Sequence, residues 1–279
     1  MVSGGPGRLR SGTVALAIGL LLAGCSGDGD TSATDTTKPS PAKSGTEEKT
    51  DGEAKGAAPS PSATNGLDFS PDDSRKPRTR AEALRLARAV TAEPSRYGAG
   101  YVKRSPYESD PGSLAVLDED CVWQREPLPP SVLTSFTRYS ELPAQGDKGP
   151  IRIAATVLVH REEADANWDM ARTLEEALRC PEQQLSDGER ITGLLSAGLA
   201  FGAGQFASED SISESGEYHS DELGGPHYYT WGQSRLGQVT VSSVGKGSKG
   251  WTSKEIDKAV IEGTAAMLVD VQNELEASA

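Results

Sequence analysis

Histidines with carboxylates nearby are the residues of this chain best suited to hold a metal ion. The segment GEYHSDELGGPHYY (216–229) contains His219 and His227 together with Glu217, Asp221 and Glu222. Two imidazoles and neighbouring carboxylates can bind a divalent metal. Gly-Pro and charged residues are also typical of a solvated hairpin tip, and this interpretation is favoured. His219 and His227 are therefore weak metal candidates, and no metal site or cofactor is predicted.

Motifs for nucleophilic catalysis are incomplete. Ser243 and Lys246 fit S-x-x-K, the pattern of penicillin-recognising serine enzymes, but the partner motifs S-D-N and K-T-G are absent from the sequence. The sequence also lacks G-x-S-x-G, H-E-x-x-H and a P-loop. His160 follows an apolar run and is expected to be a partly exposed residue at a strand end. We therefore predict no catalytic residues and no enzymatic activity.

Tryptophans could line a cleft for a sugar or a lipid, or could pack in the core. The four are Trp123, Trp168, Trp231 and Trp251. Trp168 lies on the apolar side of a predicted helix and is expected in the core. Tyr229 and Trp231 share one face of a predicted strand, which suits either core packing or a groove. The ligand-binding residues stay unassigned at this point.

Helices that would position these residues are predicted at three places. The first covers 79–90 and the last begins at 252, and each opens with the spacing of a capping box, Thr79 with Glu82 and Thr252 with Glu255. The middle helix covers 162–180. Its predicted apolar stripe consists of Ala164, Trp168, Ala171, Leu174 or Glu175, and Leu178.

Strands are predicted between and after these helices. They lie around 121–123 and in 131–142, 150–161, 190–206, 211–220 and 226–245, with a flexible loop closing the 190–206 segment and a turn at 235–238. Successive strands with interspersed helices predict an α+β domain over 77–279. We expect an antiparallel β-sheet with helices packed on one face.

The N-terminus has the organisation of an export signal. Arg8 and Arg10 precede an apolar run of eleven residues, TVALAIGLLLA (13–23). This run is shorter than the roughly 20 residues that span a bilayer, and its basic flank is typical of a secretory signal peptide. The run ends at Leu22-Ala23-Gly24-Cys25, which resembles the lipobox of bacterial lipoproteins. The resemblance implies that residues 1–24 are removed and that Cys25 is acylated. The protein would then be anchored on the extracellular face of the cytoplasmic membrane.

A polar segment follows Cys25. Between residues 26 and 66 there is no aromatic residue and no Leu, Ile, Val or Met. Such a segment cannot bury enough apolar surface to offset chain entropy, so 25–76 is predicted to be the lipidated cysteine and a disordered linker.

The chain is acidic overall. Its net charge is −13, and loss of the leader with Arg8 and Arg10 leaves 26 basic and 41 acidic residues, a net charge of −15. This balance argues against nucleic acid as a partner, because phosphate binding needs a basic surface. It also argues against electrostatic docking on anionic lipid.

Two cysteines remain once Cys25 is assigned to lipid. Exported proteins meet oxidising conditions, which favour pairing of Cys121 with Cys180. Zinc is disfavoured because the sequence has neither C-x-x-C nor paired histidines at zinc-binding spacing. We predict a Cys121–Cys180 disulfide that ties a strand to the end of the middle helix.

The region from 77 to 278 resembles the extracytoplasmic sensor-like domains of lipoproteins and receptor kinases in high-GC Gram-positive bacteria. The resemblance rests on Cys121 with Trp123, ALRCP (177–181), SRLGQVTVSSVG (234–245) and the final helix. It implies a central sheet with a cleft for an unidentified ligand, and no catalytic residues.

The expected function is therefore that of a membrane-anchored surface lipoprotein with a ligand-binding or sensor-like domain. Besides the membrane, its partner would be a small molecule, a lipid or an envelope protein. The alternatives are a cell-envelope hydrolase, a carrier of lipid or wall precursor, and an accessory subunit of an envelope complex.

Overall fold

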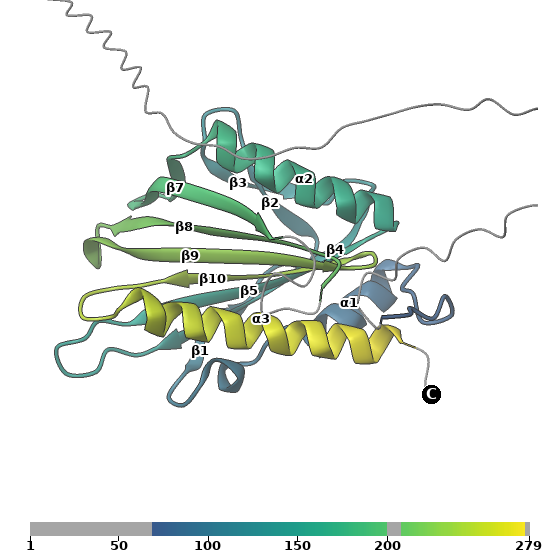
Figure 1. Cartoon of the computed structure of the whole chain (residues 1–279), viewed down its shortest axis with the longest axis horizontal. Coiled ribbons are helices and arrows are strands. Elements are labelled where there is room, and N and C mark those ends of the chain that lie inside the picture. The colour runs from purple at the N-terminus through teal and green to yellow at the C-terminus, as the bar shows by residue number, and fades with distance from the viewer. Residues whose placement is uncertain (1–68, 200–207, 277–279) are drawn as a thin grey trace, which may run out of the picture. The chain divides into compact units, whose positions relative to one another are not determined.

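The computed structural model describes residues 69–199 and 208–276 (Figure 1). The predicted signal peptide, Cys25 and most of the predicted linker lie outside the described residues, as does the glycine-rich stretch 200–207. Within the described part, no helix is both long and apolar enough to cross a membrane.

An eight-stranded antiparallel sheet forms the centre of the domain, in the order β1-β4-β5-β10-β9-β8-β7-β6. The strands are β1 (Val102–Glu108), β4 (Val132–Leu142), β5 (Ile151–His160), β10 (Val239–Lys246), β9 (Gly224–Leu236), β8 (Asp210–Ser220), β7 (Glu189–Leu199) and β6 (Gln183–Ser186). A separate hairpin consists of β2 (Ser113–Leu117) and β3 (Trp123–Pro127). The helices are α1 (Arg80–Val90), the short 3-10 helix η1 (Pro94–Tyr97), α2 (Glu163–Arg179) and α3 (Ser253–Leu275). The predicted α+β class is confirmed.

One face of the sheet carries the main hydrophobic core. The alternate residues of β5 that were predicted to share a face, from Ile151 to Val159, are buried in one cluster with α1 and α3. Both predicted capping boxes are present, at Thr79 with Glu82 and at Thr252 with Glu255. These caps satisfy backbone N–H groups that the first turn of a helix leaves without partners.

The opposite face of the sheet is covered by α2. In α2 the buried residues are Ala166, Asp169, Met170 and Ala177. Trp168 is 75% exposed and Leu178 is 77% exposed, so the predicted apolar stripe points to solvent and the prediction of Trp168 as a core residue is wrong. The reason is that part of the sheet face beneath α2 is polar, and Asp169 and Thr173 bond to Gln233 there. Ala177, nearer the end of α2, packs instead in a second hydrophobic cluster with residues such as Tyr218 and Tyr229.

The predicted disulfide is confirmed. Cys121, in the loop between β2 and β3, is bonded to Cys180, the residue that ends α2, with their Cα atoms 5.6 Å apart. The N–H of Gln184 also donates to the backbone oxygen of Cys121 at 2.9 Å. The hairpin is therefore fixed to the end of α2 and to the start of β6.

Residues just upstream of α1 belong to the folded unit. The ring of Phe69 packs against the core, and the N–H of Asp72 donates to the backbone oxygen of Leu275 at 2.8 Å. The folded part therefore starts before residue 77, and its first residues lie beside the end of α3.

Candidate binding cavity

A cavity of about 310 Å³ lies between the sheet, α2 and the β2–β3 hairpin. Its volume is at the lower end of the range for small-molecule pockets. The sheet forms the floor of the cavity. At the centre of this floor, β5 and β10 carry short side chains, which leave a depression: Ala154, Thr156, Ser242 and Val244. Larger side chains on the flanking strands enclose this hollow.

Strand register brings the floor residues into rows. One row crosses five strands and consists of Glu214, Trp231, Val244, Ala154 and Tyr139. The row beside it consists of Gln233, Ser242, Thr156 and Thr137. Residues paired in this way on one face of a sheet lie about 5 Å apart, so each row is a continuous surface.

Aromatic side chains form much of the cavity wall. Trp123 donates from Nε1 to Oε1 of Gln183 at 2.8 Å, which fixes the hairpin wall against the start of β6. Tyr229 and Trp231 both line the cavity, and both also pack in a hydrophobic cluster, so the strand face serves for core packing and for the groove. Trp251 lies elsewhere and donates to the backbone oxygen of Gly149 at 2.6 Å.

A buried polar cluster joins the roof to the floor. Asp169 on α2 accepts hydrogen bonds from Gln233 at 2.8 Å and from Thr240 at 3.3 Å, and its Oδ2 lies 3.6 Å from His160 Nε2. Burial raises the pKa of Asp169, but these partners and Arg172 bring it below its ordinary value. His160 is 2% exposed, so the expected exposed strand-end position is wrong. It is buried because α2 lies over that end of β5.

Two further carboxylates face the cavity. Glu214 on β8 is 8% exposed, and its pKa rises to about 7, mainly through burial and also through the nearby Glu176. Burial also raises the pKa of Glu176 on α2. No ion pair to Glu214 is found in the described part of the chain, whereas Glu176 lies 3.5 Å from Nε of Arg172.

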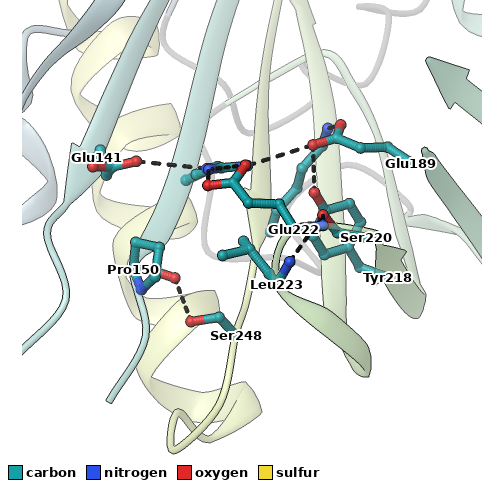
Figure 2. A network of polar contacts seen from close by, with 10 residues as sticks. Glu141, Pro150, Glu189, Tyr218, Ser220, Glu222, Leu223 and Ser248 are labelled. Carbon is teal, nitrogen blue, oxygen red and sulfur yellow. Dashed lines mark hydrogen bonds and ion pairs between the residues drawn. The ribbon is translucent and has the colours of Figure 1, made fainter. Parts of the chain in front are cut away.

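The end of the cavity at β10 is closed by an ion-pair network. Lys246 lines the cavity and its Nζ lies 2.6 Å from Oε2 of Glu189. Glu189 also accepts a hydrogen bond from the Tyr218 hydroxyl and pairs with the guanidinium of Arg152. Figure 2 shows the carboxylates of Glu189, Glu141 and Glu222 turned toward this network.

The S-x-x-K residues are not brought together. Residues three apart on a strand point to opposite faces. Ser243 is fully buried on the face that packs on α3, and Lys246 is on the cavity face. The motif therefore forms no nucleophile and base pair.

The metal candidates also have separate surroundings. Nε2 of His219 lies 2.9 Å from the Thr192 hydroxyl, and Nε2 of His227 lies 2.9 Å from the backbone oxygen of Leu223. Over residues 69–199 and 208–276, no group of three or more His, Cys, Asp or Glu has the arrangement of a metal site.

Sequence reasoning missed Glu214, Glu176 and Arg125 as cavity residues. The alternation of SISESGEY (211–218) places Ile212, Glu214 and Tyr218 on one face, and this was the available signal for Glu214. No signal pointed to Glu176, because the predicted inward side of α2 was the wrong one.

The chain was compared with protein-family models, curated proteins and solved structures. No protein-family model, curated protein or solved structure matches the chain.

Proposed function

We propose that this protein is a lipid-anchored surface lipoprotein whose folded domain binds a small molecule in the cavity beneath α2. The observation that carries the proposal is the cavity itself, which has short side chains at the centre of its floor and aromatic side chains in its wall. It also contains the buried carboxylate of Glu214, which has no ionic partner among the residues that the structure describes. Concave sites with aromatic walls and a few convergent polar groups are typical of ligand-binding sites.

Binding is favoured over catalysis because Asp169 and Lys246, two charged groups of the cavity, already have partners within the protein. Asp169 is held by Gln233 and Arg172, and Lys246 is held by Glu189. Hydrolases that act through a serine nucleophile need that nucleophile in contact with a base, and S-x-x-K does not provide such a pair here. The cavity groups therefore suit recognition.

The anchor belongs to the same proposal and rests on the lipobox-like sequence before Cys25. A diacylated cysteine gives stable membrane attachment, because each buried methylene contributes about 0.8 kcal/mol. The full chain should sediment with membranes, and Cys25→Ala should move it to the soluble fraction. A Cys25→Ala protein that stays with membranes after a high-salt wash contradicts this part.

Native mass spectrometry of the full chain, purified from its own host in detergent, tests the binding function. We expect a bound small molecule in the wild-type protein and in Ala171→Phe, which places a ring on the exposed side of α2. Ala154→Phe fills the centre of the floor and should abolish the bound mass. A ligand that survives Ala154→Phe, or no ligand in the wild type, contradicts the proposal.

A further inference from the structure

Glu214 is a buried carboxyl group for which the described residues provide no cationic partner. Glu214 is 8% exposed. The polar groups that act on its carboxyl group are the Ser196 hydroxyl and the like-charged Glu176. Burying a carboxylate without a cation is costly, so such groups are normally paired. The cavity beside Glu214 is therefore a place where a cation would find an unmet partner.

The cations that line the cavity are already engaged or lie at its rim. Arg172 forms its closest ion pair with Asp169 at 2.5 Å, and its side chain is 45% exposed. Lys246 is paired with Glu189. Arg125 is exposed and donates to the Tyr139 hydroxyl at 3.1 Å. The β8 end of the cavity thus keeps a net negative charge.

Aromatic residues lie directly next to this charge. Trp231 is the register partner of Glu214 on β9, and Tyr229 lies two residues away on the same face. The Glu214 charge also contributes to the raised pKa of Tyr229. Trp and Tyr rings attract ammonium groups within about 6 Å, and cages of such rings recognise quaternary ammonium ligands.

We propose that the cavity binds a small organic ammonium ion, with the cationic nitrogen between Glu214 and the rings of Trp231 and Tyr229. This inference rests on the proposed binding function and adds the ligand class. An inorganic anion would meet Glu214 as a repulsive charge. A metal ion is disfavoured because the described residues provide no three-ligand cluster.

Choline and its neutral carbon isostere 3,3-dimethylbutan-1-ol have nearly the same shape, but only choline carries a positive charge. Comparing their affinities therefore measures the contribution of the charge. Isothermal titration of the full chain in nonionic detergent at pH 8 should show at least tenfold tighter binding of choline. In Glu214→Gln that preference should fall to less than threefold. Glu217→Gln is the matched control, because Glu217 is on the same strand and its side chain is 61% exposed. It should leave the preference unchanged.

Protonation provides an independent readout. Choline affinity should drop about tenfold between pH 8 and pH 6, because Glu214 gains a proton as the pH falls through about 7. The other charged and titratable groups facing this space are Asp169, Arg172 and Glu176 on α2, Tyr139 on β4, Tyr229 on β9, Lys246 on β10 and Arg125 on β3. The pH effect should therefore disappear in Glu214→Gln, and binding of the isostere should change little.

Trp231→Leu tests the aromatic contribution with Glu214 intact, and should weaken choline more than the isostere. Equal binding of both probes, with both lost in Ala154→Phe, would overturn the ammonium assignment and leave the binding function standing. Absence of choline binding would also overturn the assignment. Failure of the binding function would appear separately, as a wild-type protein without any bound host molecule.

Discussion

Asp169 and Gln233 join the roof of the cavity to its floor. The side-chain amide of Gln233 on β9 donates to Oδ2 of Asp169 on α2 at 2.8 Å, in a place where both residues are buried. The helical turn of α2 that contains Asp169 thus contacts the sheet through polar side chains. The position of α2 depends on them as well as on the buried Met170.

Asp169→Ala should lower the free energy of unfolding by about 3–5 kcal/mol, because breaking a buried pair leaves its partners without one. His160, Gln233 and Arg172 would each lose a contact. Denaturant unfolding of the full chain measures the change. Asp147→Ala, at an exposed position, should change stability by less than about 0.5 kcal/mol. Equal effects of the two substitutions would contradict the role of Asp169.

Glu214→Gln should stabilise the protein at pH 8 and have little effect at pH 4. The folded-state pKa of about 7 lies above the ordinary value of 4.5, so the folded protein binds more protons than the unfolded chain between these values. Wild-type stability therefore falls as pH rises through this window, by up to about 3 kcal/mol from this group. Unfolding curves of both proteins from pH 4 to pH 8 should diverge with rising pH. Parallel curves would rule out the raised pKa.

Replacing both Cys121 and Cys180 by alanine should lower stability by about 4 kcal/mol, the chain-entropy value for a crosslink spanning 59 residues. Thermal or denaturant unfolding measures this change. Reductant should lower the stability of the wild type and leave the double variant unaffected. Thiol labelling of the denatured, unreduced domain provides a direct check, since two free thiols at these positions would exclude the bond.

Trp168→Ser and Leu178→Ser should each change the free energy of unfolding by less than about 0.5 kcal/mol, because both side chains are largely exposed. Met170→Ala is the internal comparison on the same helix. Met170 is 2% exposed, and its truncation should cost about 2–5 kcal/mol. A large loss at Trp168 would mean that the helix packs with the side predicted from the sequence.

Local signals predicted most of the framework. Alternation in β5 identified the buried positions from Ile151 to Val159, and Thr79 and Thr252 marked two helix starts correctly. The face of α2 could not be predicted this way. Its periodicity showed an apolar side, but the polar contacts of the sheet at Gln233 and Thr240 made Asp169 rather than Trp168 the inward residue.

The site was predictable only in part. The strand pattern placed Tyr229 and Trp231 on one face, but no local pattern predicts their register against Glu214. The cavity also depends on short residues of β5 and β10 that meet only in the folded sheet, Ala154 with Val244 and Thr156 with Ser242. Such contacts between distant segments have no local sequence signature.

The bond between Cys121 and Cys180 makes the connection between two parts of the cavity lining sensitive to redox conditions. The hairpin with Trp123 and the helix with Glu176 both line the cavity, and this bond joins them covalently. In a reducing cytoplasm both cysteines remain thiols, and weaker contacts such as that from Arg179 to the backbone oxygen of Asp118 hold the walls. If the chain is exported as proposed, the hairpin would be linked covalently to α2 only after oxidation outside the cytoplasm.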